Sequence, residues 1–211
     1  GRESGSFRER EPPNARSRTR PSVPVVNSMS DPTGDISAGY ERVALEYMAN
    51  RSGVGASVVR DWALSLPGGA AVLDIGCGHG VPISAALLEE GLAVHGIDPS
   101  PTLVSAFRAR FPGVPVECGT LDSSSLFGRS FDAAIAWGVL FLLEPGAQPG
   151  LIGRVASALQ PGGSFIFTAP VQQCEWQDSM TGLKSVSLGG EAYRQLAREV
   201  GLQVLREGED E

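Results

Sequence analysis

Short apolar runs alternate with amphipathic segments along most of this chain of 211 residues. Six short β-rich runs predict buried strands, at 71–75, 92–97, 114–118, 131–137, 164–169 and 202–207. Apolar residues at helical spacing between these runs predict helices at 82–90, from Ser100 onward, at 148–159 and at 191–200. Buried strands alternating with helices indicate a doubly wound, Rossmann-like α/β fold with a mostly parallel sheet.

Two further helices are predicted ahead of the first strand. One has an apolar face made of Tyr40, Val43, Ala44, Tyr47 and Met48, and the second repeats the spacing with Val58, Val59, Trp62 and Leu66. The stretch 170–190 shows no such period, and we expect a long irregular loop there.

Residues 1–30 are rich in Arg, Pro, Ser and Glu and lack a hydrophobic period, which is typical of a disordered leader or tail. They also lack the apolar core of a secretory signal. The globular pattern begins close to Met29, so we hypothesise that residues 1–28 are a leader or a translation artefact. The chain therefore divides into this segment and one domain, 31–211.

Charge is distributed unevenly between these two parts. Residues 1–30 hold six of the 17 basic and three of the 24 acidic residues, so residues 31–211 are strongly acidic. An acidic domain is a poor partner for phosphate backbones, which makes nucleic acid an unfavoured partner. The three cysteines have no CxxC spacing, which indicates neither a zinc site nor a disulfide framework and favours a cytoplasmic setting. No run approaches the length of a membrane span.

A glycine-rich loop follows the first predicted strand and reads Asp74-Ile75-Gly76-Cys77-Gly78-His79-Gly80. Three glycines at a spacing of two allow a sharp turn and the close approach of a ligand, although a tight turn without a ligand would look the same. The dinucleotide fingerprint GxGxxG is not met, because Val81 and Ile83 stand where its last glycine would fall.

Acidic residues follow the next two strands. Asp98 ends the second strand, where a carboxylate can accept hydrogen bonds from both hydroxyls of a ribose. The alternative is a charge at a helix N-terminus, but Ser100-Pro101 already caps that helix. Leu121 and Asp122 follow the third strand, where they meet a ring edge or form a solvated loop. Together these motifs favour an adenosine-containing ligand.

The motifs VLDIGCGHG, GIDPS, FDAAIAWGVLFLL and LQPGGSFIFT, with the Leu121-Asp122 pair, resemble the class I S-adenosylmethionine-dependent methyltransferases of the small single-domain type. The resemblance spans about residues 36 to 207. It implies a methyltransferase that uses S-adenosyl-L-methionine, yields S-adenosyl-L-homocysteine and needs no metal. The acceptor would be a small molecule, methylated by in-line displacement.

The resemblance also implies roles for individual residues. The loop residues Asp74, Gly76, Cys77, Gly78, His79 and Gly80 would line the methionine part of the cofactor. The ribose would be held by Asp98 and Pro99, and the adenine bordered by Leu121 and Asp122. The methyl side would be walled by Trp137 and Gly138, with Tyr40 closing over the cofactor. From their place in the long loop after the fifth strand, Cys174, Trp176 and Met180 are expected to contact the acceptor, although a Trp176 that simply packs over the sheet would look the same. No residue is assigned as a catalytic acid or base.

Such folds have seven strands in the order 3-2-1-4-5-7-6, but here the sequence stops after the sixth predicted strand. We therefore expect a truncated sheet without the seventh strand, and either a monomer or a homodimer paired through the open edge. Two alternatives stay open: a methyltransferase-like module that only binds, and a nicotinamide-dependent oxidoreductase. Methylation of protein or nucleic acid is disfavoured but open, because fold does not decide the acceptor.

Overall fold

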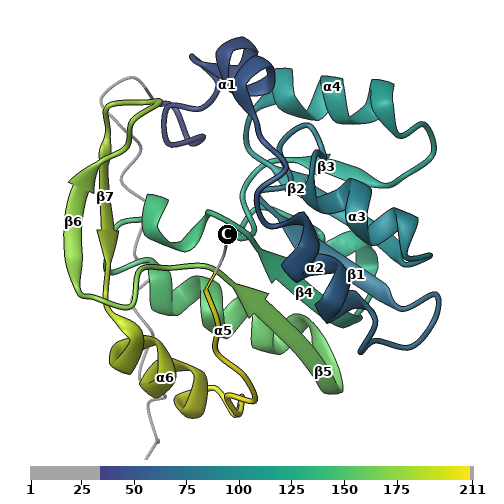
Figure 1. Ribbon diagram of the computed structural model, residues 1–211, viewed down its shortest axis with the longest axis vertical. Helices are drawn as coiled ribbons and strands as arrows, with labels where there is room; N and C mark the ends of the chain where they lie inside the picture. Colours follow the sequence, from purple (N-terminus) through teal and green to yellow (C-terminus); the bar gives the residue numbers. More distant parts are fainter. Residues whose placement is uncertain (1–33, 210–211) are drawn as a thin grey trace, which may run out of the picture.

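The computed structural model describes residues 34–209, so the proposed leader 1–28 and Met29 lie outside the described part. A five-stranded parallel sheet forms the centre, in the order β3-β2-β1-β4-β5 (Figure 1). Its strands are β1 (Ala71–Ile75), β2 (Ala93–Asp98), β3 (Val116–Cys118), β4 (Phe131–Ala136) and β5 (Leu159–Phe167). This order confirms the predicted doubly wound, Rossmann-like architecture.

The helices between the strands lie close to their predicted positions: α2 (Ala56–Ala63), α3 (Ile83–Glu89), α4 (Pro101–Arg110), α5 (Gln148–Ala158) and α6 (Gly190–Glu199). Ser100 caps α4 as predicted, with its Oγ accepting a hydrogen bond of 3.2 Å from the backbone N–H of Leu103. Two 3-10 turns, η1 (Leu126–Gly128) and η2 (Leu140–Leu142), come before and after β4.

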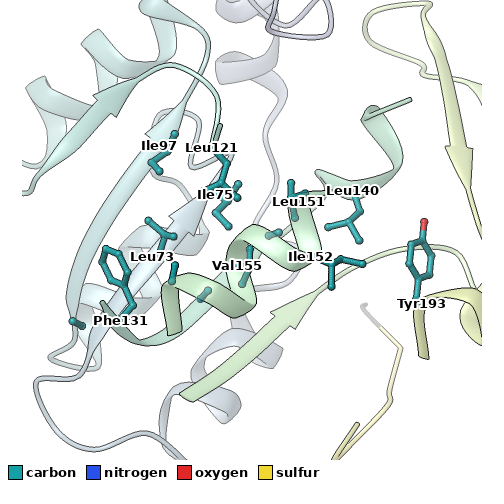
Figure 2. Close-up of a cluster of buried hydrophobic side chains, with 14 residues drawn as sticks. Leu73, Ile75, Ile97, Leu121, Phe131, Leu140, Leu151, Ile152, Val155 and Tyr193 are labelled. Atoms are coloured by element: carbon teal, nitrogen blue, oxygen red, sulfur yellow. The ribbon is translucent and has the colours of Figure 1, made fainter. Parts of the chain in front are cut away.

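Helices cover both faces of the sheet and enclose two apolar clusters. All five residues of β1 are buried: Ala71, Leu73 and Ile75 join one cluster, and Val72 joins the other. Figure 2 shows the larger cluster, in which Leu73, Ile75 and Phe131 from the strands meet Ile152 and Val155 of α5. The second cluster joins β1, β2 and β4 to α2 and α3. This rigid centre holds the carboxyl ends of β1, β2 and β4 in place.

The helix predicted ahead of α2 is much shorter than its apolar period suggested. Only α1 (Ala44–Asn50) is helical, and the chain from residue 36 to 43 forms turns. Gly39 has φ +83°, and a Cβ there would lie 3.0 Å from Leu183 and 3.1 Å from Thr181. Packing against a distant loop therefore replaces the first turns of the predicted helix. We call residues 36–51 the strap.

The stretch 170–190 is not the irregular loop that we expected. It contains an antiparallel hairpin of β6 (Cys174–Gln177) and β7 (Lys184–Ser187), which stands apart from the main sheet, above α6 in Figure 1. Asp178 Oδ1 accepts the N–H groups of Met180 and Thr181, and Gly182 takes φ +69°, so the turn closes in four to five residues.

Buried polar groups tie this hairpin to the helices beneath it. Gln148 of α5 is fully buried and donates through Nε2 to the carbonyl of Val186, at 2.9 Å. Its Oε1 accepts the hydroxyl of Tyr193 of α6 at 2.7 Å, and the same hydroxyl accepts the N–H of Leu188. The base of the hairpin is thus held by a satisfied buried network.

The strand predicted at 202–207 is wrong, since this segment is irregular. A strand needs a neighbour to pair with, and 202–207 forms no ladder with the outer edge of β5, which stays unpaired among the described residues. Glu207 instead forms an ion pair of 2.8 Å with Arg194 of α6, and Leu205 stays 85% exposed. An apolar run without a partner strand does not form a strand here.

Candidate active site

The glycine-rich loop crosses from the end of β1 to α3 over the end of β2. The backbone N–H groups of Gly76 and Cys77 both donate to the carbonyl of Ile97, at 2.8 and 3.1 Å. Gly76, Gly78 and Gly80 all have positive φ, at +69°, +55° and +85°. Each position is therefore one where an L side chain would be strained.

The three glycines have different neighbours. A Cβ at Gly76 would collide with Val139, and one at Gly80 would collide with Phe111 and lie 2.9 Å from Phe107. Packing within the chain thus accounts for two of the glycines that the motif offered as ligand contacts. Gly78 differs, because the nearest atom to a Cβ there is a ring carbon of Tyr47 at 3.5 Å. Of the three glycines, Gly78 is therefore the one that leaves space for a ligand to approach the loop.

Asp98 lies at the carboxyl end of β2, is 6% exposed and ties this loop to the start of α4. Its Oδ2 accepts the N–H of Gly78 at 2.8 Å, and its Oδ1 accepts the N–H of Ser100 at 2.9 Å. Burial raises the pKa of this carboxyl to about 6, against the effect of the two hydrogen bonds. The carboxylate has further acceptor positions for a ligand hydroxyl.

Asp74 of β1 is even more deeply buried, at 1% exposed. Its Oδ2 accepts the hydroxyl of Ser84 of α3 at 2.5 Å. Burial raises the pKa of Asp74 to about 7, and the nearby Asp98 raises it further. Within residues 34–209 no ion pair joins either carboxyl to a cation. A ligand with a positive group and hydroxyl donors would offset the cost of burying both carboxylates without a partner.

Two buried nitrogen atoms lie on the other side of Gly78 and lack a hydrogen-bond partner within the described chain. One is Nδ1 of His79, a residue 4% exposed, and the other is Nε of Arg51 in the strap. The ring of Tyr47 contacts both: its centroid is 5.8 Å from that of His79 and 5.9 Å from the guanidinium carbon of Arg51. These donors would suit an anionic group.

Burial lowers the pKa of His79, and the positive charges of Arg110 and Arg51 lower it further, so its imidazole is neutral near pH 7. Arg51 did not emerge from the sequence, because one arginine after a helix looks like an ordinary solvated residue. The loop thus lies between two carboxyls and a pair of nitrogen donors, an arrangement that matches a ligand bearing both charges.

Several predicted site residues point elsewhere with their side chains. Cys77 is buried, and its Sγ would lie 2.7 Å from a Cβ at Gly96, so it packs against β2. Burial raises the pKa of this thiol well above its ordinary value. Leu121 belongs to the larger apolar cluster, whereas Asp122 is exposed and Pro99 is half-buried. The side chains of Cys77 and Leu121 are therefore taken up by packing within the domain.

Two further predicted site residues, Trp137 and Gly138, follow β4 directly. The half-buried indole of Trp137 packs on Gly55, where a Cβ would lie 2.5 Å from it. Gly138 has φ +74° and donates its N–H to the hydroxyl of Thr168 at 2.7 Å. This bond links the ends of β4 and β5.

The strap joins the glycine loop, the start of α4 and the tip of the hairpin. Tyr40 donates its hydroxyl to Asp178 Oδ2 at 3.3 Å, and its ring meets that of Tyr47 edge-on with centroids 5.4 Å apart. Burial and the charge of Asp178 raise the pKa of this phenol well above its usual range. Arg42 donates to the carbonyl of Thr181 at 2.8 Å.

Glu41 makes the third connection of the strap. It accepts the hydroxyls of Ser100 and Thr102, the latter at 2.6 Å, and the N–H of Thr102 at 3.1 Å. These hydrogen bonds lower the pKa of Glu41. The carboxylate thereby also lies at the N-terminus of α4, where negative charge is stabilised.

Of the predicted acceptor residues in the hairpin, Trp176 lies against η2. The ring of Trp176 lies 5.2 Å from that of Phe141, tilted by 51°. Cys174 faces Ser187 across the ladder, and Met180 lies in the turn; both are half-buried. No group of three or more His, Cys, Asp or Glu suited to a metal ion occurs among residues 34–209. No helix in that range has the length and apolar character needed to cross a membrane.

Comparison with known families and solved structures shows what this domain is similar to. Residues 72–163 match the family model described as a methyltransferase domain. The five-stranded order and the solved structures of similar fold agree with that match. Residues 72–163 are therefore similar to methyltransferase domains, and the solved structures share the doubly wound fold.

Individual relatives are distant or cover part of the chain. An uncharacterized methyltransferase of Mycobacterium tuberculosis is 35% identical over 104 residues, which are 49% of this chain and 40% of that protein. The chain thus spans well under half the length of this curated relative.

Among solved structures, an S-adenosylmethionine-dependent methyltransferase of Mesorhizobium loti is 25% identical with TM-score 0.53, covering 70% of this chain and 82% of that one. The 1,6-didemethyltoxoflavin-N1-methyltransferase of Burkholderia thailandensis, solved with S-adenosylhomocysteine, is 20% identical with TM-score 0.62, covering 79% and 75%.

Proposed function

We propose that this chain is an enzyme that binds S-adenosyl-L-methionine at the glycine loop and transfers its methyl group to a small-molecule acceptor. The observation that carries the proposal is the charge pattern of the site. Two buried carboxyls, Asp74 and Asp98, have no cation partner within the described chain, and two buried nitrogens, of His79 and Arg51, have no acceptor. S-adenosyl-L-methionine combines an ammonium group, ribose hydroxyls and a carboxylate.

Each side of the site would meet the matching part of this cofactor. Asp98 would accept the ribose hydroxyls, with Pro99 beside it, and Asp74 would face the ammonium group. His79 and Arg51 would donate to the carboxylate. The backbone at Gly76 and Gly78 would let the methionine part approach, and Leu121 and Asp122 would border the adenine.

Methyl transfer from this cofactor needs few further groups from the protein. When bound, S-adenosyl-L-methionine supplies a methyl group already activated on a sulfonium sulfur. The wall at Trp137 and Gly138 and the hairpin residues Cys174, Trp176 and Met180 would hold the acceptor in line with that group. Positioning of this kind can supply on the order of 7–11 kcal/mol of the barrier. Tyr40 in the strap would help exclude water.

The remaining parts of the proposal concern partners and setting. The acidic domain supports a small acceptor over nucleic acid. Cys77, Cys118 and Cys174 are all free thiols, which supports a cytoplasmic location. We propose a monomer or a homodimer paired through the edge of β5, which is the outermost strand on its side of the described sheet.

Calorimetry with S-adenosylmethionine, S-adenosylhomocysteine and NAD tests the proposal. We expect micromolar binding of the two sulfur nucleosides and none of NAD. Asp98→Ala should weaken binding by more than about 100-fold, since two charge-assisted hydrogen bonds contribute ~1.5–3 kcal/mol each. Asp61→Ala, at an exposed carboxyl of α2 with no assigned role in the site, serves as the matched control. A folded sample that binds neither sulfur nucleoside would refute the proposal.

A further inference from the structure

One buried group in the hairpin has no role in the cofactor site. Ser185 of β7 is 1% exposed, and its Oγ has no hydrogen-bond partner within residues 34–209. A buried hydroxyl without a partner is unfavourable, because it has lost its hydrogen bonds to water. Ser185 pairs directly with Trp176 across the ladder, so the two side chains share one face of the hairpin.

The same face carries aromatic surface above the end of β4. Trp176 contacts Phe141 of η2, and η2 begins two residues after Gly138. Both aromatic side chains are half-buried, so part of each ring is left uncovered. An unpartnered hydroxyl beside uncovered aromatic rings, next to the wall of the proposed methyl site, points to a ligand that is both flat and polar.

The charged side chains of the hairpin are all engaged elsewhere. Glu175 and Lys184 form an ion pair of 2.8 Å and are each about 60% exposed. Asp178 accepts the Tyr40 hydroxyl together with the N–H groups of Met180 and Thr181. The hairpin therefore offers no free cation to bind an anionic acceptor. It also offers no free carboxylate to bind a cationic acceptor, because Glu175 and Asp178 already have partners.

A base to deprotonate an acceptor is also missing from this face of the hairpin. The Tyr40 phenol keeps its proton, because burial and Asp178 raise its pKa. The neutral imidazole of His79 is separated from Tyr40 by the ring of Tyr47, as the successive ring contacts show. The site therefore suits a nucleophile with a lone pair that is available without prior loss of a proton.

We propose, on the basis of the function proposed above, that the acceptor is a small uncharged amine or heteroaromatic nitrogen compound that stacks on Trp176 and Phe141 and hydrogen-bonds to Ser185. The nitrogen lone pair forms the new N–CH3 bond as the S–CH3 bond breaks and its electron pair stays on sulfur. The positive charge passes to nitrogen, where aromatic faces stabilise it, and an amine then releases a proton to water.

Analogues of S-adenosylhomocysteine in which nitrogen replaces sulfur and carries an arm test this proposal without a known acceptor. The arms are 4-aminobenzyl, cyclohexylmethyl and 4-carboxybenzyl, and binding is measured by calorimetry against S-adenosylhomocysteine. We expect the aminobenzyl arm to tighten binding about tenfold through stacking and one hydrogen bond. The cyclohexyl arm should give a smaller gain and the carboxybenzyl arm none.

Variants test whether the tighter binding of the aminobenzyl analogue comes from Trp176 and Ser185. Trp176→Leu should remove the tenfold gain and leave S-adenosylhomocysteine binding unchanged, and Trp176→Phe should restore most of it. Ser185→Ala should weaken only the aminobenzyl analogue, by about threefold. The control is Gln177→Ala, the exposed neighbour of Trp176 on the strand, which should change nothing.

The outcomes separate the two proposals. If S-adenosylhomocysteine itself fails to bind, the proposed function is wrong and the acceptor proposal falls with it. If it binds but all three arms bind alike, or the carboxybenzyl arm binds best, only the acceptor proposal is wrong. The same conclusion follows if Trp176→Leu weakens S-adenosylhomocysteine and the aminobenzyl analogue by equal factors.

Discussion

Folding favours the protonated form of Asp74, whereas the proposed ligand favours its ionised form. Its carboxyl is fully buried, and its pKa rises from the ordinary value of 3.8 to about 7. A raised pKa means that the folded state favours the protonated form. The stability from this group is complete below pH 3.8 and is lost as the pH rises through about 7. The full loss is about 4 kcal/mol, of which about 2.5 kcal/mol falls between pH 5 and pH 8.

Asp74→Asn removes the charge and keeps the shape. The amide oxygen can still accept the Ser84 hydroxyl, so the change isolates the desolvated charge. We expect the variant to gain stability over the parent protein as the pH rises, by about 2.5 kcal/mol between pH 5 and pH 8. Urea unfolding of both proteins at the two pH values measures this difference, and other titrating groups cancel in it.

Ligand binding should respond in the opposite direction. The parent protein should bind S-adenosylhomocysteine more tightly at pH 8 than at pH 5.5 and release protons on binding near neutral pH, because the ligand favours the ionised carboxyls. Calorimetry in buffers of different ionisation enthalpy counts these protons. Asp74→Asn should bind more weakly and release fewer of them.

Asp61→Asn on α2 is the matched control for these measurements, since this carboxyl is exposed and its neutralisation removes no buried charge. A stability difference between Asp74→Asn and the parent that does not change with pH would refute the reasoning. Such a result would mean that the carboxylate keeps its hydration in the folded protein.

Three further predictions concern other parts of the site. Arg51→Gln should weaken S-adenosylhomocysteine about tenfold and leave 5′-methylthioadenosine unchanged in calorimetry, because only the first ligand has a carboxylate; equal losses would contradict this role. Gly80→Ala should destabilise by about 3 kcal/mol in urea unfolding, since its Cβ would collide with Phe111, whereas Gly91→Ala, with similar φ and open space, should lose only about 1 kcal/mol; equal effects would show that strain alone matters. Glu41→Gln should speed hydrogen exchange throughout the strap, because it weakens the attachment to α4; unchanged exchange would show that the hairpin contacts suffice.

The central sheet was predictable because its signal is local. The run 71–75 is apolar except for Asp74 and is buried on both faces, and the Ser100-Pro101 pair carries its own capping chemistry. The position of Asp98 at the end of β2 could be predicted from the alternation of strands and helices. In each case a few neighbouring residues determine the outcome.

The elements that cover the site depend on distant contacts and were harder to predict. The helical period before residue 44 is overridden by the packing of Gly39 on the hairpin tip. The run 202–207 has strand composition but pairs with no strand among the described residues. The hairpin did have a local signal, because two short alternating runs flank the turn from Asp178 to Gly182, a turn rich in small and polar residues.

The strap has a thermodynamic consequence of its own. It is held to the rest of the domain by side-chain hydrogen bonds and ring contacts, including Glu41 on α4 and Tyr40 on Asp178, rather than by a strand ladder. Segments held in this way open at much lower free energy than the sheet. A ligand that engages Arg51 and His79 would therefore pull a local opening equilibrium toward the closed form. Its measured affinity would be its intrinsic affinity multiplied by the fraction of molecules in which the strap is closed.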